Sequence, residues 1–465
     1  MTPTSLSPVS TPTLADIAAQ LQGYDPQALR ADQVTDFLAR LVQPVTESEA
    51  VGIFDALGRV LAQDVVSPLS VPPHDNSAMD GFAFDGAQLV AGAPLVLRVV
   101  GKALAGATWT GRAGPGECVK IMTGAVMPAG LDTVAPQELT TSASTGAEGE
   151  HIAIAANLLR PGDNRRLKGE DLLEGRVALS KGELLTPAAL GLLASLGLQT
   201  VPVLRRLRVA YFSTGDEILS LGEPPRPGAV YDSNRYTVIG LLTRLGVQVI
   251  DLGVVPDAPA PLQAAMLQAA QLADAILTSG GVSGGDADHT RAVMRECGDV
   301  AFWRIAMRPG RPMAVGRIHA GPISAKLAAS PCKSIADSSQ NNSDTVPTDA
   351  LLFGLPGNPV AVMVAFLAFV RPALLRMMGS TRSAAPLLRA RSSEAIRKKP
   401  GRTEYQRGIV STAPDGTLQV RSTGPQGSGV LSSMVQANGL IVLHHDQGNV
   451  AVGDALDVML FDGVI

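Results

Sequence analysis

The second half of the chain alternates between apolar segments typical of buried strands and segments with helical spacing, which constrains the fold more than any other feature. The expected strands are 206–214, 247–253, 273–281, 300–305, 312–318 and 351–355. The expected helices are 234–245, 261–272, 288–297 and 359–378. This alternation predicts an α/β domain at 207–380 with a parallel-type sheet, which binds ligands at the carboxyl ends of its strands.

The first two hundred residues have a different pattern. Helical spacing is present at 32–41 and 47–61, and Thr186-Pro187 provides a cap and a first-turn proline for a helix that ends near residue 196. Between these segments, short Val/Ile/Ala runs alternate with Gly/Pro turns. The pattern predicts a β-rich domain at 73–169, inserted into a discontinuous helical domain made of 29–72 and 170–206.

The remaining segments complete a multidomain α/β and β fold class. Short strands after residue 385 predict a compact C-terminal β-barrel at 385–465. Residues 1–28 are expected to form a flexible extension, because they are rich in Pro, Ser and Thr. The Ser/Asn/Asp-rich insertion at 324–349 is expected to be disordered, since connections within such domains are normally short.

Composition excludes several functional classes. A length of 465 residues predicts several domains, and a formal net charge of -4 argues against broad nucleic-acid binding. The three cysteines, Cys118, Cys297 and Cys332, have no paired spacing, which favours a reducing compartment. No signal-peptide pattern is present, and the apolar run at 360–370 is too short to span a membrane. We therefore expect a cytoplasmic protein without a membrane or nucleic-acid partner.

Three polar motifs lie in or beside the β-rich domain. The DNSAMDG turn contains Asp75 and Asp80, which together can receive a metal or orient water. Thr123 follows a strand, and a charged run at 165–171 ends in Asp171. Each motif also has a simpler explanation, because Asp and Asn bond their own backbone in turns and charged turns are usually solvated.

Two motifs of the α/β domain are more informative. FSTGDE at 212–217 places hydrogen-bond donors and carboxylates at the end of one strand. TSGGVSGGDADHT at 278–290 forms a glycine-rich loop that opens a helix, and such loops bring backbone N–H groups close to anions. Asp286 and Asp288 in this loop are suited to holding Mg²⁺ against phosphates.

An arginine-rich turn follows in RIAMRPGRP. Guanidinium groups suit tetrahedral oxyanions, so Arg304, Arg308 and Arg311 are candidates for anion binding. LPGNP at 355–359 makes a rigid loop directly before a helix, which is a second anion-binding arrangement. The alternative is a set of surface arginines that face solvent.

Taken in order, nine motifs resemble the MoeA family of molybdopterin molybdenumtransferases, which includes the E domain of gephyrin and its plant relative. These motifs are VVSPLSVPPHDNSAMDGFA, IMTGAVMP, GED, FSTGDE, YDSNR, TSGGVSGGDADHT, AFWRIAMRPGRP, LPGNPV and GRTEYQRG. The resemblance implies four domains and a homodimer whose cleft combines both chains. It also implies insertion of molybdenum from molybdate into adenylylated molybdopterin, with Mg²⁺ assisting and AMP released.

The resemblance also implies a set of site residues. The catalytic set would be Asp80, Thr123, Asp171, Glu217, Asp257 and Asp288, the last three as Mg²⁺ ligands. The substrate-binding set would be Ser213, Thr214, Gly215, Asp232, Asn234, Gly280, Gly281, Ser283, Arg304, Pro356 and Pro359. The molybdate set would be Arg308, Arg311, Arg407 and Ser428.

Three features differ from the usual family pattern, and the insertion at 324–349 is one of them. Arginines replace lysines at 304, 308 and 311, which keeps the charge and changes the donor geometry. Pro136 limits its strand to an edge or a bulge. Two alternative functions stay open: a molybdopterin adenylyltransferase, which would need neither the inserted domain nor the barrel, and a non-enzymatic scaffold of the gephyrin type. In the preferred function, the adenylyltransferase is a possible separate partner.

Overall fold

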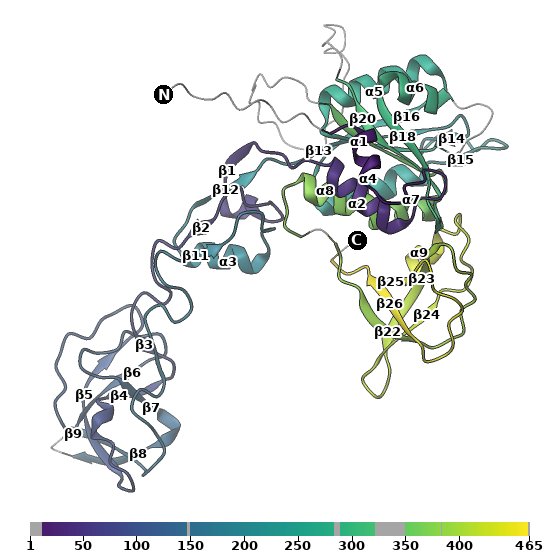
Figure 1. Cartoon of the computed structure of the whole chain (residues 1–465). Helices are drawn as coiled ribbons and strands as arrows, with labels where there is room; N and C mark the ends of the chain where they lie inside the picture. Colours follow the sequence, from purple (N-terminus) through teal and green to yellow (C-terminus); the bar gives the residue numbers. More distant parts are fainter. Residues whose placement is uncertain (1–11, 147–148, 283–288, 321–348, 383, 464–465) are drawn as a thin grey trace, which may run out of the picture.

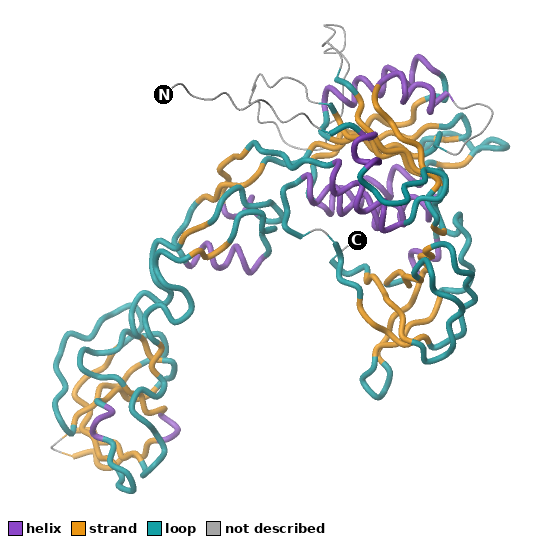
Figure 2. Tube along the Cα trace, viewed as in Figure 1, coloured by secondary structure: helices purple, strands orange, loops and turns teal. Residues whose placement is uncertain are grey.

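The computed structural model describes residues 12–146, 149–282, 289–320, 349–382 and 384–463. Figure 1 shows an α/β domain with a small barrel beside it, and a long arm that ends in a β-rich lobe. Figure 2 shows that the lobe and the barrel are built mainly of strands and loops, whereas most helices surround the central sheet. Residues 283–288 and 321–348, which contain Ser283, Asp288 and most of the 324–349 insertion, lie outside the described residues.

The α/β domain is built on a six-stranded sheet in the order β16-β13-β17-β21-β20-β18. The strands are β13 (Arg208–Thr214), β16 (Gln248–Val255), β17 (Ala275–Ser279), β18 (Gly298–Arg304), β20 (Pro312–Ile318) and β21 (Ala350–Leu355). All six expected strands are confirmed. The sheet is mixed, however, because β20 runs antiparallel to both of its neighbours. Its first residue, Pro312, therefore pairs with Arg304 at the edge where the other strands end.

Helices cover both faces of this sheet, as expected for the class. The helices α5 (Pro259–Leu272) and α6 (His289–Cys297) share one apolar core with the sheet. The other face packs against α4 (Ser233–Leu245) and a continuous helix made of α7 (Pro359–Ala365), the π-helical η5 (Phe366–Val370) and α8 (Arg371–Met377). That helix is long and apolar enough to cross a membrane, but 78% of its apolar window is buried inside the protein. It is a core helix.

Two N-terminal helices also pack on the α/β domain. Helices α1 (Leu14–Ala19) and α2 (Ala31–Leu41) bury Leu14, Ile17 and Phe37 in the same core as α7 and α8. The expectation of a flexible extension was therefore wrong for the described part of 1–28, because apolar residues at helical spacing anchor it. The expected helix at 32–41 is confirmed. It was expected in the discontinuous helical domain, but it packs on the α/β domain.

The arm is a discontinuous unit in which two distant chain segments pair. The expected helix at 47–61 was wrong: the segment forms β1 (Ser48–Gly52) and the 3₁₀ turn η1 (Ile53–Ala56). Pairing of β1 with β12 (Thr200–Leu204) overrides the local helical pattern, which is also weakened by Gly52 and Gly58. The short strands β2 (Val65–Val66) and β11 (Val177–Leu179) pair next to α3 (Pro187–Ser195), which confirms the expected helix.

The lobe at the end of the arm is a six-stranded sheet in the order β7-β4-β6-β5-β9-β8. Its strands are β4 (Gly81–Phe84), β5 (Leu95–Ala103), β6 (Glu117–Ile121), β7 (Thr133–Pro136), β8 (Thr140–Gly146) and β9 (Gly149–Ile154). Pro136 lies in the edge strand β7, as its missing N–H predicts. The short strands β3 (Asn76–Ser77) and β10 (Arg165–Arg166) pair where the lobe meets the arm.

The C-terminal domain is a closed barrel, as expected. Its strands are β22 (Leu388–Ser392), β23 (Thr403–Thr412), β24 (Leu418–Ser422), β25 (Gly439–Leu443) and β26 (Ala455–Leu460). The barrel closes because β23 pairs with both β24 and β25. The short strand β19 (Met307–Arg308) of the α/β domain pairs with β23, so the arginine-rich turn is joined directly to the barrel.

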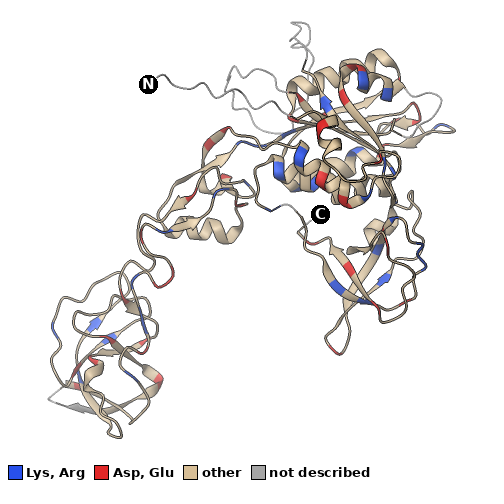
Figure 3. Cartoon of the chain, viewed as in Figure 1, with Lys and Arg blue, Asp and Glu red and all other residues tan. Residues whose placement is uncertain are grey.

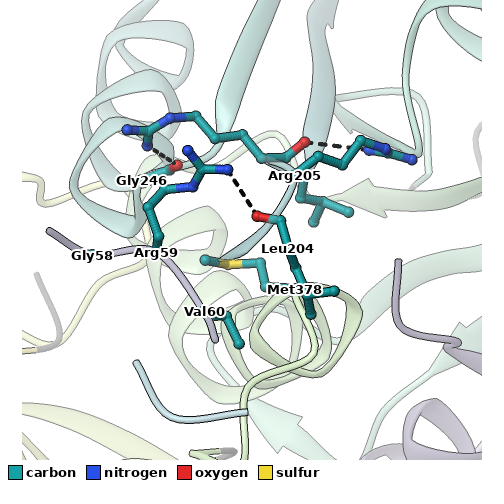
Figure 4. A pocket seen from close by; sticks show the side chains of 9 residues that line it. Gly58, Arg59, Val60, Leu204, Arg205, Gly246 and Met378 are labelled. Carbon is teal, nitrogen blue, oxygen red and sulfur yellow. Dashed lines mark hydrogen bonds between the residues drawn. The ribbon is translucent and has the colours of Figure 1, made fainter. Parts of the chain in front are cut away.

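The arm leaves the α/β domain at a closely packed joint. Figure 4 shows Arg59, which donates to the backbone carbonyl of Leu204 at 2.8 Å. Beside it, Arg205 donates to both carboxylate oxygens of Asp274 at 2.7 and 2.9 Å and pairs with Glu47 at 3.3 Å. The space left at the joint is only about 10 Å³. These contacts link the arm to the sheet and fix its direction.

Candidate active site

A row of buried hydroxyl groups marks the carboxyl ends of β13 and β17. Ser213, Thr214 and Ser279 are almost fully buried there, and Thr278 is completely buried. The Tyr211 hydroxyl shares hydrogen bonds with the hydroxyls of Ser213 at 2.9 Å and Ser279 at 2.7 Å. These hydroxyl groups are therefore part of the sheet, and the sheet fixes their positions.

Several polar atoms beside this row lack a partner. In the described part of the chain, no hydrogen bond reaches four buried oxygens: Thr214 Oγ1, Thr278 Oγ1, Asp232 Oδ2 and Asn234 Oδ1. Buried polar atoms are nearly always paired, so such a group needs an explanation. Asp232 and Asn234 lie at the start of α4, beside the sheet edge where β13 ends. Since Thr214 ends β13, these unpartnered oxygens occur at the carboxyl end of the sheet, where folds of this class bind polar ligands.

The glycine turn after β17 cannot accept side chains. Gly280 has φ +97°, and a Cβ atom there would lie 2.3 Å from the carbonyl oxygen of Thr214. Gly281 has φ +64°, and its Cβ would lie 2.4 Å from the Thr290 hydroxyl. Both positions thus require glycine, and the backbone passes directly over the end of β13. This close approach is the geometry expected of an anion-binding turn.

Carboxylates lie at the same edge of the sheet. The backbone N–H of Asp257 donates to Asp216 Oδ1 at 3.2 Å, and the Thr290 hydroxyl donates to Asp257 Oδ1 at 3.0 Å. Glu217 is exposed in the turn that follows Gly215. Carboxylate oxygens are the donors that Mg²⁺ prefers, so these residues suit that ion chemically. Among the described residues, however, no three such side chains are grouped closely enough to hold a metal.

The arginine-rich turn forms one wall of a cavity of about 520 Å³ between the α/β domain and the barrel. Arg308 and Arg311 line it from the turn, and Ser428 lines it from the barrel. Pro356 and Asn358 of the LPGNP loop complete the wall beside α7. The structure thus brings together most of the expected molybdate set and one of the expected substrate-binding prolines.

The charges of this turn are not compensated within the protein. In the part of the chain that the structure describes, the guanidinium groups of Arg304, Arg308 and Arg311 have neither an ion pair nor a hydrogen bond. Along the rest of the ribbon, positively and negatively charged residues are interspersed (Figure 3). Unpaired guanidinium groups around a cavity attract anions and suit tetrahedral oxyanions.

Arg407 lies behind the wall of this cavity rather than in its lining. It is fully buried, and it donates to the Ser433 hydroxyl at 2.9 Å and to the carbonyl oxygens of Pro425 and Gly427 at 3.3 and 3.0 Å. Burial, with a smaller contribution from the charge of Arg308, lowers the pKa of Arg407 to about 10. It therefore remains charged at neutral pH and holds the loop that presents Ser428.

Three further lining residues were not selected from the sequence. Arg402, Gln426 and Asn358 face the arginine cavity. Arg402 pairs with the buried carboxylate of Glu404 at 2.8 Å, which fixes its guanidinium group. Its place at the start of the GRTEYQRG motif was the available signal. Gln426 and Asn358 lie in loops whose positions depend on the folded barrel and on α7.

Arg304 ends β18 and Pro359 begins α7, whereas the expected residues Asp80, Thr123 and Asp171 lie in the lobe or where the lobe meets the arm. Asp80 accepts hydrogen bonds from Thr123, and both side chains are exposed. Asp171 is also exposed, and its backbone N–H donates to the carbonyl oxygen of Val71 at 3.0 Å. Figure 1 shows the lobe at the far end of the arm, away from the α/β domain. One chain therefore does not bring Asp80 to the strand-end site.

Comparisons with known proteins agree with this architecture. Three family models match consecutive parts of the chain: the MoeA N-terminal region (domain I and II) at 29–197, a probable molybdopterin binding domain at 210–376, and the MoeA C-terminal region (domain IV) at 389–461. Molybdopterin molybdenumtransferase from Haemophilus influenzae is 36% identical over 438 residues, which cover 94% of this chain and 100% of the relative.

Other relatives extend the comparison. Molybdopterin molybdenumtransferase 2 from Mycobacterium tuberculosis is 35% identical over 431 residues, or 90% of this chain and 96% of the relative. The crystal structure of a molybdopterin biosynthesis moeA protein from Pyrococcus horikoshii OT3 has a TM-score of 0.73 at 24% identity and covers 93% of this chain and 100% of its own. This structure supports the same fold.

The relatives and the fold together define a multidomain transferase built around an α/β domain with a polar strand-end site. The chain belongs to the MoeA family of molybdopterin molybdenumtransferases.

Proposed function

We propose that the chain transfers molybdenum from molybdate to adenylylated molybdopterin and releases AMP. The observation that carries this proposal is the cavity lined by Arg308 and Arg311, whose guanidinium groups have no ion pair or hydrogen bond within the described residues. The LPGNP loop links this cavity to the strand-end site, because Pro356 and Asn358 line the cavity and the Asn234 amide donates to the carbonyl oxygen of Gly357 between them. An oxyanion and a polar organic ligand can therefore be held next to each other. The direct test is whether AMP release by the purified protein depends on molybdate.

The arginine cavity overcomes a repulsion between the two substrates. Molybdate is a dianion, and the substrate that receives the metal is itself negative, so co-binding requires fixed positive charge. Arg308 and Arg311 provide this charge from one turn, Arg402 adds a guanidinium group fixed by Glu404, and Ser428 adds a hydroxyl donor. The two dithiolene thiols of the pterin would then bond to the metal through their sulfurs, and their two protons would leave with one displaced oxo ligand as water.

The strand-end site would hold the phosphoanhydride of the substrate. Backbone N–H groups of the glycine turn and the buried hydroxyls are the donors for its oxygens. Mg²⁺, bound by Glu217, Asp257 and Asp288, would neutralise the phosphate charge during cleavage of the anhydride. The chain's own contribution is electrostatic: it orients the phosphates and a water molecule, without a covalent nucleophile.

We also propose that the active form is a homodimer. Asp80 and Thr123 lie too far along the arm to reach the strand-end site of their own chain (Figure 1). A second copy can place its lobe against that site, and Asp80, Thr123 and Asp171 would then complete it. In this arrangement the closely packed joint sets where the lobe lies.

The cellular setting proposed for this function is the cytoplasm. A separate molybdopterin adenylyltransferase would supply the adenylylated substrate, because the chain uses that compound and does not make it. The barrel favours the transferase over an adenylyltransferase, because the arginine cavity needs residues of both the barrel and the α/β domain.

A further inference from the structure

The chain carries a local excess of positive charge where α8 leads into the barrel. Residues 371–402 contain nine Lys and Arg side chains and one acidic residue, Glu394, although the whole chain has a formal net charge of -4. The excess extends to the arginine cavity, because Arg402 at the end of this range lines it. Residues 397–402, with the sequence RKKPGR, are called the basic loop below.

The side chain of Lys398 anchors the basic loop to the barrel. It is only 4% exposed, and its Nζ donates to the carbonyl oxygen of Gln447 at 2.8 Å and to those of His445 and Lys399 at 3.4 Å. The N–H of Gly401 donates to the same carbonyl oxygen of His445 at 2.9 Å. The backbone of the loop is therefore held in one place, and its other side chains stay near the cavity.

The basic residues on either side of this anchor are exposed and lack a counter-charge. In the described part of the chain, the side chains of Arg397 and Lys399 have neither an ion pair nor a hydrogen bond. The carboxylates of Glu404 and Asp446, which act on the loop, already pair with other arginines. Two positive charges thus remain uncompensated outside the cavity.

The field of these two charges reaches the cavity. Backbone geometry allows at most about 3.6 Å per residue, so the Cα atom of Lys399 lies within about 11 Å of that of Arg402, and that of Arg397 within about 18 Å. The Debye length is about 8 Å at physiological ionic strength and about 20 Å at about 20 mM. Charges at this range attract an anion before it makes any contact.

We propose that the basic loop forms an electrostatic entrance to the arginine cavity, which attracts anionic substrates from solution. Arg397 and Lys399 act over a distance and bond no substrate atom, whereas Arg308 and Arg311 bind by contact. The inference rests on the proposed function, because molybdate and adenylylated molybdopterin are both anions. Since a distant field acts on charge rather than shape, selectivity among anions stays with the cavity.

Calorimetric titration of molybdate into the full-length protein, at ionic strengths of about 20 mM and about 0.5 M, tests this role. Arg397→Glu combined with Lys399→Glu should weaken binding about 10-fold at the low ionic strength and less than about 2-fold at the high one, because salt screens distant charges. Arg397→Gln combined with Lys399→Gln changes half as much charge and should weaken binding about 3-fold at the low ionic strength. Arg176→Glu combined with Lys181→Glu, at exposed positions of the arm, makes the same change in net charge and should match the wild type.

Contact and long-range attraction differ in their dependence on salt. Arg308→Ala removes a contact in the cavity, so it should weaken molybdate binding at both ionic strengths; Arg244→Ala, at an exposed position on α4, is its control. The inference is overturned if the loop variants bind molybdate like the wild type at the low ionic strength. It is also overturned if their deficit persists at the high one, as a misfolded loop would give. A wild type that binds no molybdate at either ionic strength would overturn the proposed function as well, so the two failures are distinguishable.

Discussion

Oδ1 of Asp80 accepts two hydrogen bonds from Thr123, one from the backbone N–H at 2.7 Å and one from the hydroxyl at 2.8 Å. The backbone bond and then the hydroxyl bond lower the pKa of Asp80 below its ordinary value of 3.8. A carboxylate whose pKa is lowered stays ionised as the pH falls to that ordinary value. The exposed lobe thus presents a fixed negative charge, which suits a role at the active site of a second copy.

Thr123→Val should raise the pKa of Asp80 towards its ordinary value, because it removes the hydroxyl bond and keeps the backbone bond. Thr123→Ser, which keeps the hydroxyl, should leave the pKa unchanged. An NMR titration of the Asp80 carboxyl carbon in both variants measures this difference. Identical titrations for valine and serine would show that the hydroxyl does not act on Asp80.

Asp80→Asn should abolish AMP release, since it removes the charge and keeps the size of the side chain. Asp85→Asn, also in the lobe, is the control, because Asp85 only caps the turn at Ala87. Titration of molybdate into Asp80→Asn should give the wild-type affinity. Wild-type turnover by this variant would contradict the role given to the lobe.

Asp274→Asn should destabilise the joint of the arm. Burial alone would raise the pKa of Asp274, but hydrogen bonds from Arg205 and Arg208 outweigh it and lower the pKa. Loss of a buried charged partner costs about 1–3 kcal/mol at neutral pH. Because the folded pKa is lowered, this stabilisation is present above the ordinary value of 3.8 and is lost as the pH falls below it.

Urea unfolding between pH 6 and pH 3 measures this contribution. The difference between wild type and Asp274→Asn should shrink as the pH falls below about 4. Asp446→Asn is the control, since Asp446 is exposed and its contact with Arg30 is 3.6 Å long. A difference that stays constant over this range would mean that the carboxylate charge is not what stabilises the joint.

Arg407→Lys should raise the molybdate concentration needed for half-maximal turnover by about 10-fold, because a single ammonium nitrogen cannot occupy the positions of both Nε, which bonds Ser433, and Nη2, which bonds the two loop carbonyls. Arg421→Lys, at an exposed position of β24, is the control. Binding of adenylylated molybdopterin should change little. If Arg407→Lys has the same molybdate dependence as the wild type, the Arg407 guanidinium group does not position the loop that carries Ser428.

Replacement of residues 322–348 by a short Gly/Ser linker should leave stability and activity close to those of the wild type. Ile318 and Ala350 on either side are direct partners in the antiparallel pair of β20 and β21, so a short connection can join these strands. The linker keeps the pair between His319 and Asp349, whose atoms are 3.1 Å apart. A large fall in melting temperature would show that the insertion has a structural role.

The sequence predicted the fold best where a periodic pattern and a clear boundary coincided. The strand before FSTGDE and the helix after Thr186-Pro187 were found within a residue or two of their ends. The pattern at 47–61 misled, because the pairing of Ser48 with Leu204 is a contact between distant segments that no local signal contains. The direction of β20 was missed for the same reason.

The site was predicted in part. The family resemblance identified Arg308, Arg311 and Ser428, which the fold brings to one cavity. It did not reveal that Arg407 lies behind that cavity, because burial of a charged side chain depends on the closed barrel. Nor did it select Arg402, which only the pairing of β19 with β23 brings to the turn.

AMP release with and without molybdate tests the central claim most directly. The wild type, supplied with adenylylated molybdopterin and Mg²⁺, should release AMP only when molybdate is added, and sulfate at the same concentration should not replace it. The Arg308→Ala variant should need more molybdate for the same rate, whereas Arg244→Ala should match the wild type. Equal AMP release with and without molybdate, or none under either condition, would contradict the assignment of this chain as the enzyme that inserts molybdenum.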